Sequence, residues 1–409
     1  MPGLQNQGSS HLSSHNNQKK RIYSLILAFF LIIFLVLAIF LYRASNQRSN
    51  TNATPDARSA YFAGDLKKAK EKYKKAYEAN KKDPKAIADV IKTIAFEGNQ
   101  TGQEKKSLQD ARPYIDSALK IDDKNIDILL SVGYAYETAG NYQEALKYYS
   151  EAVKLYPDVS YAWFHHGHVL EFLGKRNDAD KSYDESLKIN PENTSTLMAK
   201  ANIAGGKGDL ENSYGLYKKA ASVEGISSIL KAEALTGASI VRRNQVLHMR
   251  EAISLAREAV NASPTFSPAL SAYGYALAIN GNPNQGIIYL KKSIDTNPRI
   301  SKNYSQLAQV YRANKDFTNS INTQKIAISK VDDDNTILGT EVKKVVKARY
   351  IYDLAKTYDK AKIEANIISL LSEAVRVNPA IRQVIKADFE KSLYFESLAN
   401  DSAFEALVK

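Results

Sequence analysis

Cysteine is absent from this chain of 409 residues. Without a thiol, the protein can form neither a disulfide nor a thiolate zinc site, and it can have no cysteine nucleophile. Composition alone therefore excludes three classes of chemistry. The same absence does not identify the cellular compartment.

The sequence contains no long block of basic residues alone or of acidic residues alone. The net charge is +12, but four basic residues and no acidic residue precede Ala44. The rest of the chain has 52 basic and 44 acidic residues, a net charge of +8. This is a mild excess over a long surface, and no segment has the basic density typical of nucleic-acid binding. The sequence therefore predicts no nucleic-acid partner.

Motifs for metal binding are missing as well. The repeat region has one histidine cluster, His165, His166 and His168. Adjacent residues of a helix point in different directions, so only His165 and His168 share a face, and no His-Glu-x-x-His motif is present. We expect no bound metal here. His166 should pack within the fold, and His168 should line a surface groove.

The run Ala204–Gly208 invites comparison with a phosphate-binding loop. Lys207 is followed by Gly208 rather than by Ser or Thr, the leading glycine is missing, and no strand precedes the run. We therefore expect a turn between helices there. No Ser-His-Asp arrangement or pair of catalytic carboxylates can be singled out elsewhere. The sequence predicts no enzyme, no cofactor and no small-molecule substrate.

What the chain does contain is a 34-residue pattern that occurs twice in succession, at 126–159 and 160–193. Positions 4, 7, 8, 11, 15, 17, 20, 24, 27 and 32 hold Leu129, Val132, Gly133, Tyr136, Gly140, Tyr142, Ala145, Tyr149, Ala152 and Pro157 in the first segment. The same positions of the second hold Trp163, His166, Gly167, Leu170, Gly174, Arg176, Ala179, Tyr183, Ser186 and Pro191.

This spacing predicts a hairpin of two helices. Positions 4, 7 and 11 lie on one face of a first helix, and positions 17, 20, 24 and 27 lie on one face of a second. Small residues at 8, 20 and 27 let the backbones approach, so the aromatic residue at 24 can fill the seam. Glycine at 15 ends the first helix, and proline at 32 ends the second. One such hairpin leaves an apolar face in water, so it must stack on a neighbour.

At these residues the chain resembles the tetratricopeptide repeat (TPR) family. The resemblance implies an all-α fold, a right-handed TPR α-solenoid. With degenerate units included, about nine helix hairpins can be counted. We expect degenerate units at 57–125, three TPRs at 126–227, three more at 233–334 after a break at 228–232, an insertion at 335–347, a last TPR at 348–381 and a C-terminal capping helix at 382–409.

A membrane segment is predicted ahead of the repeats. Residues 1–18 are a polar tail that we expect to be disordered, 19–43 an anchor with a basic flank, and 44–56 a polar linker. Ile22 to Tyr42 is an apolar stretch of 21 residues, which spans about 31 Å as a helix. A cleavable signal peptide is the alternative, but Tyr42 and Arg43 stand where small residues would be needed.

Flanking charges predict how this segment would be oriented. Lys19, Lys20 and Arg21 precede it, whereas Arg43 and Arg48 follow it. The side with more positive charge usually stays in the cytoplasm. The bias favours a cell-membrane protein with a cytoplasmic N-terminus and extracytoplasmic repeats.

The resemblance also implies a binding surface. In TPR domains, residues 2, 5, 9 and 12 of the first helix line a concave groove in which peptides bind. With the adjoining Phe172, the predicted groove residues are Tyr134, Glu137, Tyr161, Phe164, His168, Glu171, Phe172, Met198, Asn202 and Tyr275. Exposed aromatic side chains can anchor a partner. The alternative is that they pack on the neighbouring repeat.

Two functions from different classes remain open. One is a membrane-tethered TPR scaffold or adaptor that binds other proteins or peptides on the extracytoplasmic side. The other is a cytosol-facing TPR receptor or regulator in protein translocation or envelope biogenesis. Some family members grip chaperone C-termini with a set of Lys, Asn and Arg residues, which is missing from the first run of repeats, where the positions hold Leu130, Tyr134, His165, Ser195 and Ala199.

Overall fold

The computed structural model describes residues 57, 66–334, 336–337, 340–363 and 366–408. Within these ranges every regular element is helical, as the sequence predicts. The predicted membrane segment at 22–42 lies outside them. In the described part of the chain, no helix has both the length and the apolar character needed to cross a bilayer.

The helices follow one another with short connections. In chain order they are α3 (Leu66–Ala79), α4 (Pro84–Thr101), α5 (Glu104–Asp122), α6 (Ile126–Thr138), α7 (Tyr142–Leu155), α8 (Ser160–Phe172), α9 (Arg176–Ile189), α10 (Thr194–Gly206), α11 (Leu210–Ala221), α12 (Ser228–Arg243), α13 (Met249–Ala262), α14 (Ser267–Ile279), α15 (Pro283–Thr296), α16 (Ser301–Ala313), α17 (Phe317–Lys330), α18 (Thr340–Lys360), α19 (Ile367–Val377), α20 (Ile381–Glu390) and α21 (Ser402–Val408).

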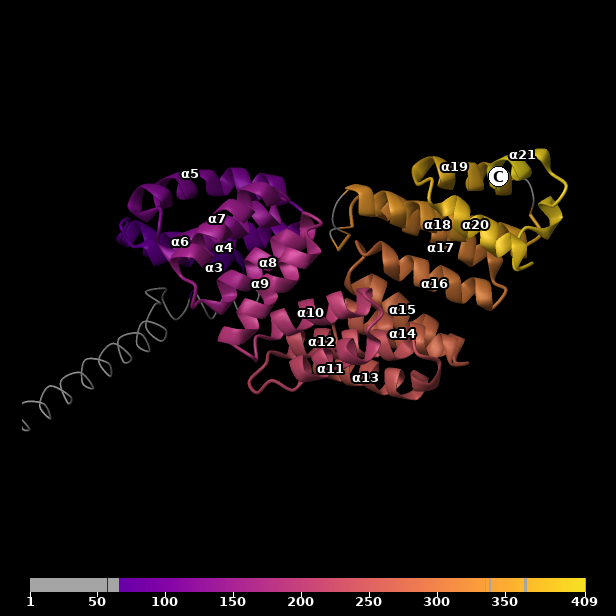
Figure 1. Cartoon of the computed structure of the whole chain (residues 1–409), viewed down its shortest axis with the longest axis horizontal. Coiled ribbons are helices and arrows are strands. Elements are labelled where there is room, and N and C mark those ends of the chain that lie inside the picture. Colours follow the sequence, from indigo (N-terminus) through magenta and orange to yellow (C-terminus); the bar gives the residue numbers. More distant parts are fainter. Residues whose placement is uncertain (1–56, 58–65, 335, 338–339, 364–365, 409) are drawn as a thin grey trace, which may run out of the picture.

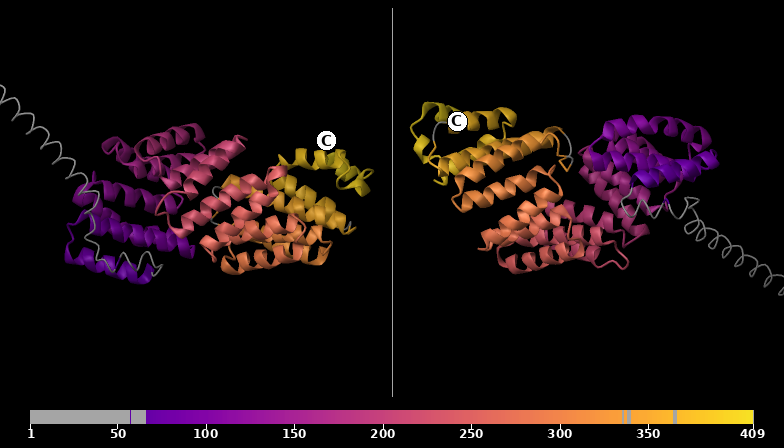
Figure 2. Two further views of the ribbon diagram at one scale, coloured as in Figure 1. Left: turned by 90° about the horizontal axis from the view of Figure 1, so that it is seen from below. Right: turned by 180° about the vertical axis from the view of Figure 1, so that it is seen from behind.

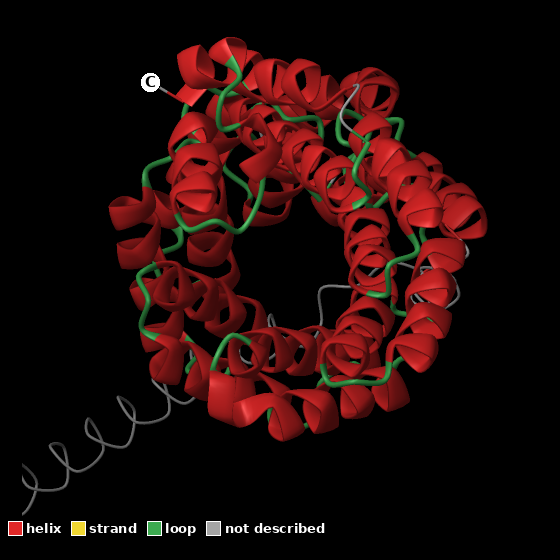
Figure 3. Cartoon of the chain, turned by 90° about the vertical axis from the view of Figure 1, so that its right-hand side faces the viewer, coloured by secondary structure: helices red, strands yellow, loops and turns green. Residues whose placement is uncertain are grey.

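Neighbouring helices pair as hairpins from α4–α5 through α18–α19, and each hairpin stacks on the next. The colours of Figure 1 therefore change steadily along the array, from α3 at one end to α21 at the other. Figure 2 shows the same succession from two more sides. Viewed end-on in Figure 3, the helices wind around a common axis, which makes the molecule a superhelix.

In four of the repeats, glycine at position 15 ends the first helix of the hairpin. The backbone there turns left-handed, which glycine adopts at no steric cost. This holds at Gly140, Gly174, Gly208 and Gly281, with φ between 75° and 88°. The two later repeats have Lys315 and Lys362 at this position, and both keep the turn with φ of 61° and 56°. The geometry of the turn is thus retained where the sequence signal for it is lost.

Glycine at position 8 explains how closely the paired helices approach. A methyl group added to Gly133 would lie 2.6 Å from the ring of Tyr149, and one added to Gly167 would lie 2.7 Å from the ring of Tyr183. Both tyrosines are fully buried. The aromatic residue at position 24 therefore fills the seam between the helices, as the spacing predicts.

Three predicted boundaries differ from the structure. Residues 228–232, predicted as a break between two runs, form the first turn of α12, capped by the Ser227 side chain. The predicted insertion at 335–347 already contains the start of α18 at Thr340. The predicted C-terminal capping helix is instead two short helices, α20 and α21, joined through a single turn at Glu396–Leu398. In each case the sequence of the segment shows no repeat pattern, so the pattern could not indicate where a helix begins or ends.

Candidate functional site

Four aromatic rings follow one face of α8 at intervals of three and four residues: Tyr161, Phe164, His168 and Phe172. We call them the α8 row. Their rings are in contact along the helix, with centroid distances of 6.2 Å from Tyr161 to Phe164, 5.6 Å from Phe164 to His168 and 4.5 Å from His168 to Phe172. The helical period therefore turns four separated residues into one continuous aromatic surface.

Exposure along the α8 row is uneven. Tyr161 is 43% exposed, whereas the other three side chains are half-buried. Phe172 stacks on Tyr142 of the previous repeat at 4.6 Å, and the Lys92 ammonium group of α4 lies over the Tyr161 ring at 5.8 Å. The row therefore packs partly against the preceding repeats and leaves its Tyr161 end accessible.

The other predicted groove residues have different environments. Met198 is buried, and Tyr134 is half-buried with its ring 6.2 Å from that of His165. Asn202 accepts a hydrogen bond from the Tyr217 hydroxyl at 2.5 Å, and the Tyr275 hydroxyl donates to Gln309 at 2.9 Å. Met198 and Asn202 lie on α10, the first helix of the next repeat, and Tyr275 lies on α14.

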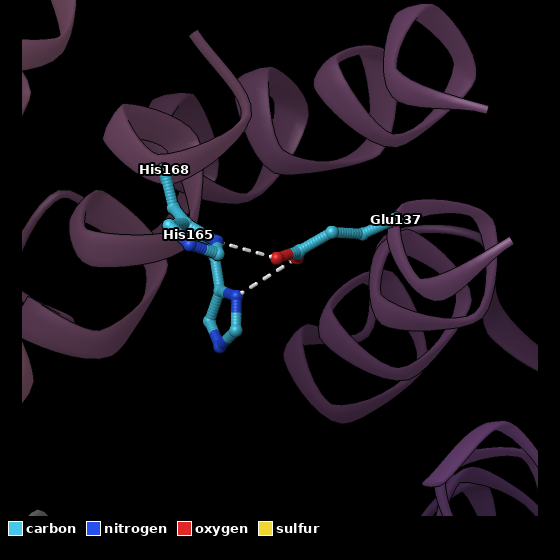
Figure 4. A group of neighbouring side chains, drawn as sticks. All are labelled: Glu137, His165 and His168. Carbon is cyan, nitrogen blue, oxygen red and sulfur yellow. Dashed lines mark hydrogen bonds and ion pairs between the residues drawn. The ribbon is translucent and has the colours of Figure 1, made fainter. Parts of the chain in front are cut away.

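Glu137 is buried, and it joins two repeats. Its side chain leaves α6 and meets His165 and His168, which lie one helical turn apart on α8 (Figure 4). The His165 Nδ1 is 3.0 Å from Glu137 Oε2, and the His168 Nδ1 is 2.6 Å from Glu137 Oε1. We call these three residues the Glu137 cluster. An ionised carboxylate can only accept, so each imidazole donates through Nδ1.

The electrostatics of the Glu137 cluster favour an ion pair. Burial alone would raise the pKa of Glu137, but the charges and hydrogen bonds of His165 and His168 together lower it well below its usual range. Burial opposes the charged form of His168, yet the hydrogen bond to Glu137 leaves the pKa of His168 raised. The carboxylate is thus held ionised inside the protein by its two imidazole partners.

A tyrosine from the same hairpin completes the shell around Glu137. The Tyr149 hydroxyl donates to Glu137 Oε2 at 2.6 Å, and burial, followed by the nearby carboxylate, raises the pKa of Tyr149 well above its ordinary value. The next repeat has the same pairing, because the Tyr183 hydroxyl donates to Glu171 Oε2 at 3.1 Å. A glutamate at position 12 and a tyrosine at position 24 therefore form a recurrent contact within the repeat.

Sequence reasoning missed His165 and Tyr149 as neighbours of Glu137. It placed His168 and Glu137 in the groove separately, although Glu137 is buried. A signal was present in the spacing of 12 residues between glutamate and tyrosine, which recurs one repeat later. His166, by contrast, packs as expected, with its Nδ1 3.0 Å from the Ser182 hydroxyl, and burial lowers its pKa.

The glycine-rich run Ala204–Gly208 forms the end of α10 and the left-handed turn after it, with φ of 84° at Gly208. The backbone amides of Lys207, Gly208 and Asp209 donate to carbonyl groups of the preceding helix, so they cap the helix. This confirms the turn predicted from the sequence.

Comparison with known proteins agrees with this geometry. Models of the tetratricopeptide repeat match residues 126–159 and 160–193. No curated protein sequence matches the chain.

Two solved structures resemble the chain at low sequence identity. The human IFIT1 dimer with PPP-AAAA is 17% identical, has a TM-score of 0.51, and aligns over 82% of this chain and 85% of that chain. A tetratricopeptide repeat protein from Parabacteroides merdae is 18% identical over 62% of this chain and 95% of that chain, with a TM-score of 0.46. With two tetratricopeptide repeats matched at 126–193 and its hairpins stacked as a helical solenoid, the chain is a protein that contains tetratricopeptide repeats.

Proposed function

We propose that the protein is a membrane-tethered TPR scaffold that binds other proteins or peptide segments on the extracytoplasmic side. One observation supports the binding role above all: the α8 row is a continuous aromatic surface whose Tyr161 end is 43% exposed. Aromatic residues supply much of the binding energy at protein interfaces when a partner covers them. A stack of hairpins with no catalytic motif is also typical of a scaffold rather than an enzyme.

The tether rests on the sequence. Residues 22–42 are long and apolar enough to span a bilayer, and the basic residues at 19–21 favour a cytoplasmic N-terminus. The alternative is a cytosol-facing receptor or regulator with the same anchor. Protease added to intact cells or spheroplasts separates the two, because an extracytoplasmic solenoid is degraded and a cytosolic one is protected.

The proposed partner is a protein rather than a nucleic acid. The IFIT1 structure contains PPP-AAAA, but the likeness to that protein is one of fold at 17% identity. The excess of positive charge in this chain is small and dispersed. Binding that depends on the aromatic surface would tolerate added salt, whereas phosphate contacts weaken steeply as salt rises.

A photo-crosslinking amino acid placed at Tyr161 tests the binding surface in the cell. We expect defined protein adducts at this position. The matched control is the same amino acid at Leu247, which is 94% exposed and lies on the short turn between α12 and α13. Equal adducts at both positions, or none at Tyr161, would contradict a role for the α8 row.

A further inference from the structure

The Glu137 cluster brings three metal-binding side chains together from two repeats. Each of Glu137, His165 and His168 offers one donor atom, and the three atoms lie within 4.8 Å of one another. In Figure 4 the two imidazoles converge on the carboxylate from the facing helix. The sequence predicts no metal site because the histidines alone offer two ligands, and the third ligand comes from the repeat before them.

The donor set fits a divalent transition-metal ion. Imidazole nitrogen and carboxylate oxygen bind Zn²⁺ at about 2.0–2.2 Å, and three protein ligands with one open position form a common zinc site. Two ligands of a tetrahedral ion lie about 3.4 Å apart at such bond lengths. The three donor atoms lie within 4.8 Å of one another, so the side chains would draw together by up to about 1.4 Å to bind an ion. The ion would replace the two Nδ1 protons that now bind the carboxylate.

The surroundings give both support and access. The Tyr149 hydroxyl donates a hydrogen bond to Glu137 Oε2 at 2.6 Å, and hydrogen bonds of this kind orient the ligands of metal sites. Rings of Tyr161 and Phe164 pack around His165 with centroids at 4.3 Å and 5.1 Å. Glu137 and His165 are buried, but the side chain of His168 is 35% exposed. An ion can therefore enter from the His168 side, and this side chain is also the one best able to move.

Packing of the repeats does not by itself require the two histidines. The next repeat has a corresponding, partly buried hydrogen bond from Tyr183 to Glu171. There the repeat positions of His165 and His168 are occupied by Ala199 and Asn202, and the hairpins stack all the same. The histidine pair is thus an addition to a contact that the array makes without it.

We propose that Glu137, His165 and His168 bind one Zn²⁺ or similar divalent transition-metal ion, which links the repeats at 126–159 and 160–193. This goes beyond the scaffold function, although the two share His168. A bound ion would fix the His168 ring and with it the centre of the α8 row.

The test uses the full chain, purified without a histidine tag and treated with chelator. Titration calorimetry with ZnCl₂ alone should show one site per chain. His168→Ala should weaken binding by at least about tenfold, since even loss of a residue supporting a ligand costs 10- to 100-fold. His166→Ala is the matched control: it lies on the same helix but contacts Ser182, so this variant should bind as the wild type does.

A second measurement covers the case in which a variant is poorly folded. Co²⁺ in place of Zn²⁺ should give the wild type a visible absorption band typical of histidine and carboxylate ligands, and Zn²⁺ should abolish it. Circular dichroism of each variant reports its fold. The proposal is overturned if the wild type does not bind Zn²⁺, if His168→Ala binds equally well, or if His166→Ala loses binding to the same extent. In the last two cases, ions would be held elsewhere on the chain.

Discussion

Arg299 lies against Glu104, although five hairpins separate the two residues along the chain. The distance from Arg299 Nη2 to Glu104 Oε1 is 3.9 Å, and the guanidinium group also lies beside Gly102. Glu104 begins α5, and Arg299 stands between α15 and α16. The superhelix thus completes a turn and touches itself where the α4–α5 connection meets the α15–α16 connection.

Replacing Arg299 by alanine should loosen this contact without unfolding the protein. The pair is partly exposed, with side chains 34% and 25% accessible, so the loss of stability should stay within about 1 kcal/mol. The chain has no natural cysteine, so spin labels at Lys105→Cys and Thr296→Cys would be specific. We expect the label distance to lengthen and broaden in Arg299→Ala. Arg257→Ala, at an exposed position of α13, should leave the distance unchanged.

Lys315 occupies a turn position that glycine fills in four other repeats. Its φ of 61° is unfavourable for a residue with a side chain. Lys315→Gly relieves a left-handed strain of about 1–2 kcal/mol. Glycine also gives the unfolded chain more conformational entropy, which offsets part of this gain. The free energy of unfolding should therefore rise by about 1 kcal/mol. Gly174→Ala should lower it by a similar amount, since φ there is 75° and no atom lies within 4 Å of the added methyl group. Thermal unfolding of both variants measures the pair of opposite shifts. A destabilised Lys315→Gly would contradict the strain argument.

Gly133 should tolerate no side chain. An alanine methyl group there would lie 2.6 Å from the ring of buried Tyr149, so Gly133→Ala should destabilise the protein by about 1–3 kcal/mol through overpacking. Gly206 is a control in the last turn of α10, with open space around an added methyl group. Gly206→Ala should be neutral or slightly stabilising, because alanine favours the helix. Equal urea denaturation midpoints for the two variants would show that the seam is looser than the structure indicates.

Asp180 forms ion pairs that connect two repeats, and its contribution to the stability of the protein should depend on pH. It contacts Lys200 at 2.8 Å and Lys207 at 3.0 Å. Burial opposes ionisation, but the hydrogen bonds from both lysines leave the pKa of Asp180 lowered. A carboxylate with a lowered pKa in the folded state stabilises the protein above its unfolded pKa of about 3.9, and this stabilisation is lost as the pH falls through the folded pKa.

Asp180→Asn should therefore cost up to about 1 kcal/mol near neutral pH and little below about pH 3. Urea unfolding at several pH values measures the difference. Asp178→Asn is the control, since that residue is mostly exposed and pairs with Lys181 on its own helix. A loss for Asp180→Asn that is independent of pH would show that the asparagine fails to pack rather than that a charge is missing.

Much of the fold could be predicted because it depends on local spacing. Leu129, Gly133 and Tyr149 identify the two helix faces and the seam between them, and Gly140 marks the end of the first helix. Two helix starts were predicted wrongly, Ser228 for α12 and Thr340 for α18. The 34-residue pattern is absent at both places. Their helices form because the neighbouring hairpins offer an apolar face to cover.

The candidate site was predictable only in part. The α8 row lies within one helix, so its period was enough to place Tyr161, Phe164, His168 and Phe172 together. The Glu137 cluster joins side chains from two helices whose separation and rotation the sequence does not state.

By itself, the sequence determined that this protein is a stack of helix hairpins, because periods of 3.6 and 34 residues are properties of the chain alone. Tertiary structure alone decided that Glu137 lies between His165 and His168, and that Glu104 meets Arg299. The physical reason is the small rotation between one hairpin and the next. This rotation is set by the packing of many side chains at once, and it accumulates along the array. Only the assembled superhelix therefore shows which distant residues meet.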